Sequence, residues 1–169
     1  MDVIDAILTR RSIRKYTGEV ISDEQLNLLL KAGFQAPSAN NLQPWHFIVV
    51  KEKENLEKIA GAHPYAKMLP QAGCGIIVCG DTNKDNRIGY LLEDCSAAIQ
   101  NILLAAHGMG LGAVWCGIYP NDDRTNEFSE ILKLPADIIP VGLIAVGHRN
   151  EEKEAIDRFD STRIHYEAW

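Results

Sequence analysis

The chain opens with a helical pattern, because four apolar residues recur three and four positions apart: Val3, Ile4, Ile7 and Leu8. A second helix is predicted to begin after Ser22, since Ser22 and Gln25 form a capping-box pair, and to continue to about Phe34. A third predicted helix covers residues 54–60. Four short apolar runs predict strands, at residues 45–50, 75–79, 113–118 and 138–146.

The longest predicted helix, residues 91–107, is apolar on nearly every face. Such a helix must be buried on all sides, which is difficult within one chain of this length. We therefore expect part of its surface to meet a second subunit, while a central helix wrapped by its own chain is the alternative. The tail favours association as well, because Ile164, Tyr166 and Trp169 should pack against another surface.

Composition narrows the class of protein. With 46% hydrophobic and 24% charged residues, the 169-residue chain resembles neither disordered proteins nor membrane proteins, and we expect one domain over residues 1–169. A net charge of −6 does not suit a broad contact with nucleic acid, so any anion must be bound by a local basic cluster. The acidic N-terminus lacks the features of a secretory signal, which predicts a cytoplasmic location.

Common motifs do not account for this sequence. The glycines of residues 108–112 follow a helix and precede a strand, which reverses the dinucleotide-binding fingerprint and predicts a helix end with a tight turn. The 4 cysteines lie in apolar stretches without C-x-x-C spacing, so we expect reduced core residues. The 5 histidines are dispersed, and no metal site is expected.

The densest basic feature is the run Arg10-Arg11-Ser12-Ile13-Arg14-Lys15 in an otherwise acidic chain. Arginine at the end of a helix can simply complement the helix dipole. However, forked guanidinium groups together with a hydroxyl can hold a phosphate bidentately. A further cation in the same run can stabilise negative charge elsewhere on the same ligand.

A second feature is the polar loop of residues 36–45, which reads Ala-Pro-Ser-Ala-Asn-Asn-Leu-Gln-Pro-Trp. On structural grounds alone it is a helix-to-strand loop stiffened by two prolines. Its amide groups also offer preorganised donors and acceptors of the kind that bind the edge of a planar heterocycle.

These two features, in this order, closely resemble the FMN-dependent nitroreductase family. The resemblance rests on R-R-S-x-R near the N-terminus and on P-S-x-x-N-x-Q-P-W after it. It continues through residues 100–106, the turn at 110–112 and the last strand with its end at 141–149, and so covers essentially the whole chain. It implies an α+β fold in which helices flank a mainly antiparallel sheet, and an interlocked homodimer with FMN bound at the subunit interface.

The resemblance also implies which residues bind FMN. Arg10 and Ser12 would contact the phosphate and ribityl chain with Arg11 nearby, and Arg14 would lie beside the pyrimidine end of the flavin. The remaining implied contacts are a second phosphate cluster (His148, Arg149), the partner subunit's loop (Pro37, Ser38, Ala39), a ring contact with its support (Asn41, Gln43) and the redox-active edge (Trp115, Cys116, Gly117).

The implied activity is a ping-pong transfer of hydride, in which NADH or NADPH reduces FMN and a nitroaromatic, quinone or other electron-poor small molecule is then reduced. Arg14 is the candidate for stabilising charge on the reduced flavin, and no protein acid or base is required. Two other interpretations stay open: a flavoenzyme of the same fold with different chemistry, such as dehalogenation or dehydrogenation, and a non-catalytic flavin-binding module.

Overall fold

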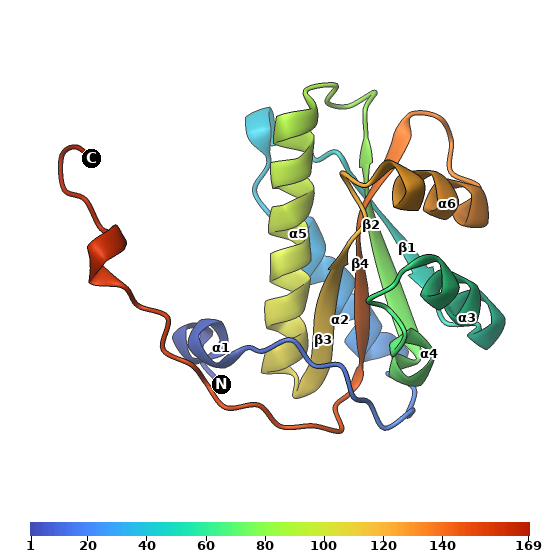
Figure 1. The fold of residues 1–169 in the computed structure, drawn as a ribbon, viewed down its shortest axis with the longest axis horizontal. Coiled ribbons are helices and arrows are strands. Elements are labelled where there is room, and N and C mark those ends of the chain that lie inside the picture. Colours follow the sequence, from blue (N-terminus) through green and yellow to red (C-terminus); the bar gives the residue numbers. More distant parts are fainter.

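The computed structural model describes residues 1–169, in which helices flank one four-stranded sheet (Figure 1). The strands run in the order β1-β2-β4-β3, and every neighbouring pair is antiparallel. Their bounds are β1 (Trp45–Val50), β2 (Cys74–Asp81), β3 (Leu111–Gly117) and β4 (Ile138–His148). This arrangement confirms the predicted α+β fold with a mainly antiparallel sheet.

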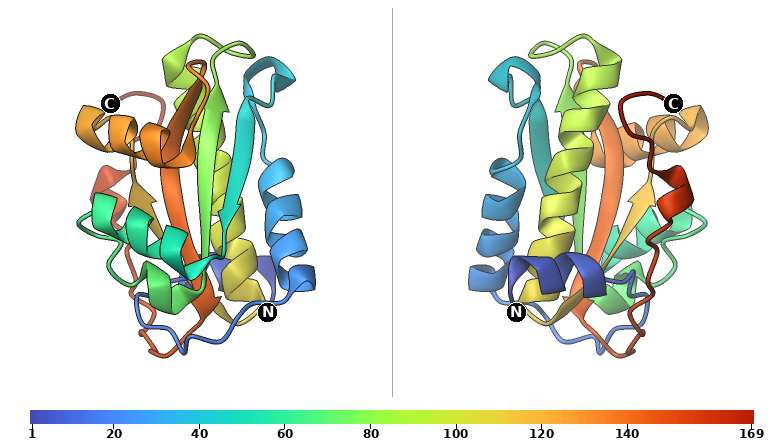
Figure 2. Two further views of the ribbon diagram at one scale, coloured as in Figure 1. Left: turned by 90° about the vertical axis from the view of Figure 1, so that its right-hand side faces the viewer. Right: turned by 90° about the vertical axis from the view of Figure 1, so that its left-hand side faces the viewer.

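Helices cover both faces of the sheet (Figure 2). They are α1 (Val3–Thr9), α2 (Asp23–Phe34), α3 (Lys53–Ala62), α4 (Leu69–Ala72), α5 (Ile88–Gly108) and α6 (Asp122–Leu132), with short 3-10 turns η1 (Ala39–Asn41) and η2 (Ser161–Arg163). The α2 and α5 helices pack on one face, and α3, α4 and α6 lie on the other (Figure 1). Along β2, Ile76 and Val78 enter the core beneath α2 and α5, whereas Ile77 enters the core on the opposite face.

Local sequence signals predict most of the helices and strands correctly. The Ser22 hydroxyl accepts from the Gln25 N–H at 3.1 Å, and the Gln25 side chain accepts from the Ser22 N–H at 2.8 Å, which completes the predicted capping box. The turn between α5 and β3 is also as predicted, with Gly110 at a φ of 77°. The sequence pattern does not predict α6, because its apolar residues, Phe128, Ile131 and Leu132, lie only in its C-terminal half and Phe128 alone is buried.

The α5 helix is not covered all round by its own chain. Leu91, Ala98 and Ile102 are fully buried, whereas Leu92 and Leu104 on other faces are only partly covered. The alternative of a helix wrapped entirely by one chain is therefore not observed. No helix is both long enough and apolar enough to cross a membrane.

Residues 150–169, called here the C-terminal arm, extend away from the sheet past α1 (Figure 1). The arm contains only the short η2 turn and exposes large apolar side chains. Phe159 is 76% exposed and Trp169 is fully exposed. Within one chain Trp169 stacks only on His165 of the same arm, at 4.2 Å between ring centroids, and both large side chains stay exposed.

Candidate functional site

The segment that carries the arginine run lies beside the sheet, where β3 begins and β4 ends. Ser12 forms a parallel bridge with Ala113 in β3, and Tyr16 forms an antiparallel bridge with Arg149, just beyond β4. The Thr17 N–H also donates to the carbonyl of the last β4 residue at 2.9 Å. The N-terminal segment and the end of β4 are therefore neighbours. The region where they meet, which contains Arg10, Ser12, His148 and Arg149, is called here the cationic junction.

Gly112 allows this close approach. A Cβ atom at residue 112 would lie 2.6 Å from Ile13 Cγ2 and 3.0 Å from Arg149 Cβ. A side chain there would push the N-terminal segment away from the end of β4. The glycine is thus required on packing grounds, and it brings the cations of both segments together.

The positive charges at this junction are only partly compensated, since the one carboxylate paired with Arg149 is that of the exposed Glu152, at 3.4 Å. Burial lowers the pKa of Arg10, and the charges of Arg11 and Arg158 lower it further. Burial also lowers the pKa of His107, whose ring lies at the C-terminal end of α5, and the charge of Arg149 adds to this effect. Cations that repel one another in this way favour the binding of an anion such as a phosphate.

Two further candidates lie at the same junction. Ser12 is half-buried, and its carbonyl accepts from the Lys153 ammonium group at 2.7 Å. His148 is also half-buried and pairs with Leu111 across the sheet, which fixes its position at the end of β4. Arg10, Ser12, His148 and Arg149 are therefore gathered at one end of the sheet.

Arg11 has a different environment from the other arginines of the run. Its guanidinium donates to the carbonyls of Glu154 and Ile156, both at 3.1 Å, and so ties the C-terminal arm to the N-terminal segment. It also donates to the carbonyls of Leu8 and Arg10. With these donors engaged, the geometry favours attachment of the arm over phosphate binding for Arg11.

Glu151 fixes the backbone of the arginine run. Its carboxylate accepts from the Arg14 and Lys15 N–H groups and lies 3.4 Å from Lys153 Nζ. These donors hold the pKa of Glu151 below its usual range, the Arg14 N–H having the largest effect. Glu151 therefore positions the backbone of Arg14 in addition to pairing with Lys153.

We expect Glu151→Ala to lower the free energy of unfolding by about 1–3 kcal/mol, because two backbone donors lose a charged acceptor. Glu154→Ala is the matched control, since the Glu154 side chain is exposed and its change should stay within about 0.5 kcal/mol. Urea unfolding of both variants measures the difference. Equal stabilities would show that Glu151 does not clamp the segment.

A cavity of about 420 Å³ lies at the other end of β3. Arg14 lines it together with Trp115, Cys116 and Gly117, so the structure brings these four predicted residues together. A Cβ at Gly117 would meet nothing within 4 Å, whereas Cys116 is 4% exposed. The Cys116 thiol points to the Tyr65 carbonyl at 3.4 Å, and burial raises its pKa, so this cysteine presents no reactive thiolate.

Three side chains that no sequence motif predicts also line this cavity: His63, Tyr65 and Arg124. The His63 ring accepts from the Tyr65 N–H at 3.2 Å, and this contact places the proton on Nε2, which lies 2.8 Å from the Gly117 carbonyl. Arg124 Nη1 donates to the same carbonyl at 3.2 Å. His63 and Arg124 therefore both bind the end of β3, and each comes from a part of the chain without a recognisable motif.

His63 should make the protein less stable in acid. Burial lowers its pKa, the hydrogen bond to Gly117 opposes this, and the charge of Arg124 lowers it again. The folded chain therefore takes up a proton less readily than the unfolded chain, so stability is complete above about pH 6.5 and falls as the pH drops towards the folded-state pKa.

The expected loss is about 1.4 kcal/mol for each unit by which the pKa is lowered. His63→Gln should remove this part of the acid sensitivity, while His107 contributes in the same direction in both proteins. Denaturant unfolding at pH 5, 6 and 8 gives the difference between them. If the free energy of unfolding falls equally with pH in wild type and variant, His63 is not the neutral group responsible for the acid sensitivity.

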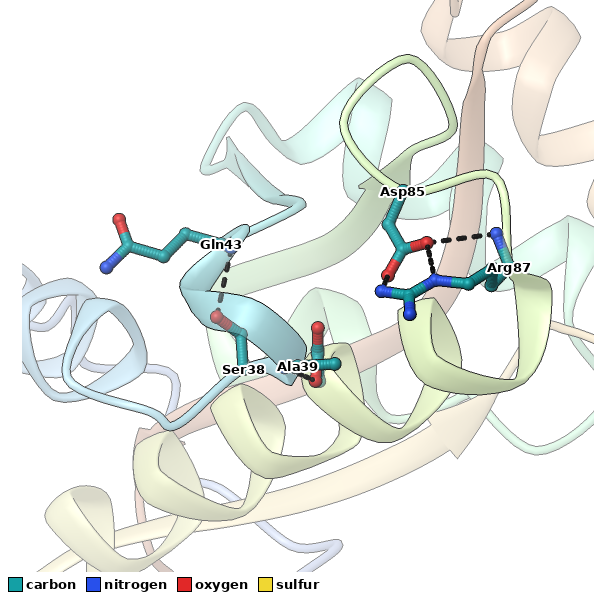
Figure 3. Close-up of polar contacts among 6 residues, drawn as sticks. Ser38, Ala39, Gln43, Asp85 and Arg87 are labelled. Carbon is teal, nitrogen blue, oxygen red and sulfur yellow. Dashed lines mark hydrogen bonds and ion pairs between the residues drawn. The ribbon is translucent and has the colours of Figure 1, made fainter.

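The predicted polar loop is held against the N-terminal half of α5 (Figure 3). The Ala39 N–H donates to the buried Asp94 carboxylate at 2.9 Å, and the Gln43 N–H donates to the Ser38 hydroxyl at 3.0 Å. Gln43 Nε2 reaches Asn41 Oδ1 at 3.1 Å, which fits the predicted supporting role. The Gln43 side chain extends away from α5 (Figure 3).

Beside the loop, Asp85 and Arg87 form a bidentate ion pair at the start of α5 (Figure 3). The Arg87 guanidinium also lies 4.5 Å from the Tyr90 ring centroid. With the Asp85 side chain 1% exposed, the pair fixes the chain that leads into α5. The pair therefore holds the start of α5, the helix whose Asp94 binds the loop.

The polar loop and the cationic junction lie apart within one chain. The loop contacts α5 at Asp94, whereas the N-terminal segment contacts it at His107, whose ring lies 2.8 Å from the Thr9 hydroxyl. At 1.5 Å per residue, these two points of α5 are about 20 Å apart. A single chain does not bring Pro37, Ser38 and Ala39 to the arginine run.

Comparison with known proteins gives a consistent result. The profile described as "Nitroreductase family" matches residues 7–63 and 61–148. A Methanothermobacter thermautotrophicus protein, whose provisional name pairs NADH dehydrogenase with NAD(P)H nitroreductase, is 47% identical over 100% of this chain and 88% of its own length.

Two solved structures extend the comparison. A Parabacteroides distasonis protein with the same provisional name is 39% identical, with a TM-score of 0.95 over 99% of this chain and 98% of that one. A provisionally named nitroreductase from Desulfovibrio desulfuricans, solved in complex with FMN, is 33% identical, with a TM-score of 0.87 over 100% of this chain and 98% of that one.

Proposed function

The chain belongs to the nitroreductase family, and on this premise we propose that it is an FMN-dependent oxidoreductase that uses NADH or NADPH to reduce nitroaromatics, quinones or similar electron-poor acceptors. One observation carries the proposal. The clustered cations near Gly112 are joined to the cavity at the end of β3 by a single segment, Arg10 to Arg14. These four residue steps span at most about 14 Å, so one elongated anionic ligand can contact both ends.

The residues present fit FMN. Arg10, Ser12, His148 and Arg149 supply cationic and hydroxyl donors for its phosphate and ribityl chain, and Gly112 gives them room to converge. When bound, FMN supplies the hydride chemistry, while the protein contributes binding and charge. The backbone of Trp115, Cys116 and Gly117 would lie along the flavin edge, and Arg14 beside its pyrimidine end.

A homodimer would complete the site. Pro37, Ser38, Ala39 and Asn41 lie about 20 Å along α5 from the cations, so the partner subunit would supply them if two α5 helices pack in opposite directions. The partly covered face of α5 and the exposed apolar side chains of the C-terminal arm would be buried by the same association.

The absorption spectrum of the purified protein tests the proposal. We expect a yellow protein that bleaches when NADH is added without oxygen and regains colour when an electron acceptor follows. Sedimentation should give twice the mass of one chain. A protein that binds FMN but is not bleached by NADH or NADPH would be a binding module, and a colourless monomer that refuses FMN would overturn the proposal.

A further inference from the structure

The cavity at the end of β3 has lining residues that the proposed function leaves unassigned. Arg14 and the strand residues Trp115, Cys116 and Gly117 account for part of the lining. Another part is formed by Tyr65, from the segment after α3, and by Arg124, from the first turn of α6. These side chains face the same space and belong to no part of the FMN site described above.

The cavity is positively charged, although the protein is acidic. Two arginines, Arg14 and Arg124, line it, and no aspartate or glutamate does, in a chain of net charge −6. His63, the only other ionisable group of basic type in the wall, is held neutral by the Tyr65 N–H and by burial. The cavity therefore attracts a negatively charged molecule.

Arg124 is held in place by neutral groups only. Its Nη1 donates to the Gly117 carbonyl at 3.2 Å, and its guanidinium lies 5.9 Å from the Tyr65 ring centroid. It forms no ion pair with any carboxylate of the chain. Its charge and its remaining donors are thus available to a ligand, and its anchor is the residue proposed to lie at the flavin edge.

The surroundings of Arg124 suit a flat ligand. Tyr65 is 70% exposed and borders the cavity, and its ring lies 5.9 Å from the Arg124 guanidinium. Aromatic rings of this kind stack on planar molecules, and a guanidinium binds a carboxylate with two parallel hydrogen bonds. A planar ring that carries one carboxylate matches both features.

We propose that Arg124 binds the carboxylate of the electron acceptor, so that this enzyme prefers aromatic or quinonoid acids to their neutral analogues. The inference rests on the proposed function and specifies its substrate class. Loss of a charged hydrogen-bonded partner corresponds to about a tenfold to hundredfold change in binding. The phosphates of the nicotinamide donor are the other source of negative charge, and the experiment separates the two.

The test uses the FMN-loaded dimer of wild type, Arg124→Gln and Arg124→Lys, with 4-nitrobenzoate and its neutral analogue 4-nitrobenzamide. Binding of benzoate and benzamide to the oxidised enzyme, followed by the flavin spectrum, gives a readout independent of turnover. We expect wild type to favour each acid about tenfold or more, Arg124→Gln to abolish this preference, and Arg124→Lys to retain part of it. Lys133→Gln, which removes an exposed charge beyond the far end of α6, should behave as wild type.

Three results would overturn the inference: no preference for the acid in wild type, equal losses for acid and amide in Arg124→Gln, or a change confined to the KM of NADH or NADPH. The last would assign Arg124 to the donor. A protein that binds FMN and is bleached by NADH but shows no preference keeps the proposed function and loses this inference. A protein that takes up no FMN loses both.

Discussion

Replacing Arg10 or Arg149 with alanine should weaken FMN binding about tenfold to a hundredfold and leave riboflavin binding unchanged. Each arginine would donate charged hydrogen bonds to the phosphate, and each such contact contributes about 1.5–3 kcal/mol. Burial lowers the pKa of Arg10, and the charges of Arg11 and Arg158 lower it further, so the cations repel one another without an anion. Removing one arginine therefore weakens the attraction for the FMN phosphate and leaves the contacts with the flavin ring unchanged.

Riboflavin makes this prediction specific, because it lacks the phosphate and keeps the ring system. Titration of the apoprotein with each flavin, followed by fluorescence quenching, gives both affinities. Lys31→Ala is the matched control, since it removes one exposed positive charge from α2, away from the junction. Equal losses for FMN and riboflavin would assign the two arginines a structural role and contradict the phosphate site.

The elements that could be predicted are those whose signals are local. The capping box at Ser22 and the four apolar runs needed only neighbouring residues, and all of them are present in the structure. The α6 helix was missed because only Phe128 of its 11 residues is buried. Its start is marked by Asn121, whose side chain accepts from the Arg124 N–H, but one such cap is too common to predict a helix.

The site residues likewise fall into those that a local motif predicts and those that only the fold brings together. The arginine run and the polar loop were visible as motifs, whereas the contact between His63 and Gly117 joins residues 54 positions apart and depends on the fold. The arginines of the run also proved unequal. Arg11 is engaged by backbone carbonyls of the C-terminal arm, and no sequence pattern distinguishes it from Arg10.

The acidic residues after β4 show why charge alone is a poor guide. Glu152 does pair with Arg149, at 3.4 Å, but its side chain is 81% exposed and the pair contributes little in solvent. Glu151, one position earlier, instead binds backbone N–H groups of the N-terminal segment. Adjacent carboxylates thus have separate roles, which only their positions in the folded chain reveal.

Arg14→Ala should lower the midpoint potential of bound FMN by about 30–60 mV and slow its reduction by NADH, with a smaller loss of FMN affinity than Arg10→Ala. Arg14 lines the cavity at the end of β3, its backbone is fixed by Glu151, and its side chain forms no ion pair. A cation held in this position stabilises the negative charge of the reduced flavin more than the neutral oxidised ring. A stabilisation of about 1.4–3 kcal/mol corresponds to this potential range for a two-electron couple.

Potentiometry and stopped-flow reduction by NADH measure the two effects, and an FMN titration gives the affinity. Lys15→Ala is the control, because it removes the neighbouring exposed cation, which does not line this cavity. Arg14→Lys should restore much of the potential, since the charge is kept while the planar fork is lost. If Arg14→Ala and Arg10→Ala lose FMN affinity equally and both keep the wild-type potential, the two arginines act on binding alone, and no residue of the run acts on the reduced flavin.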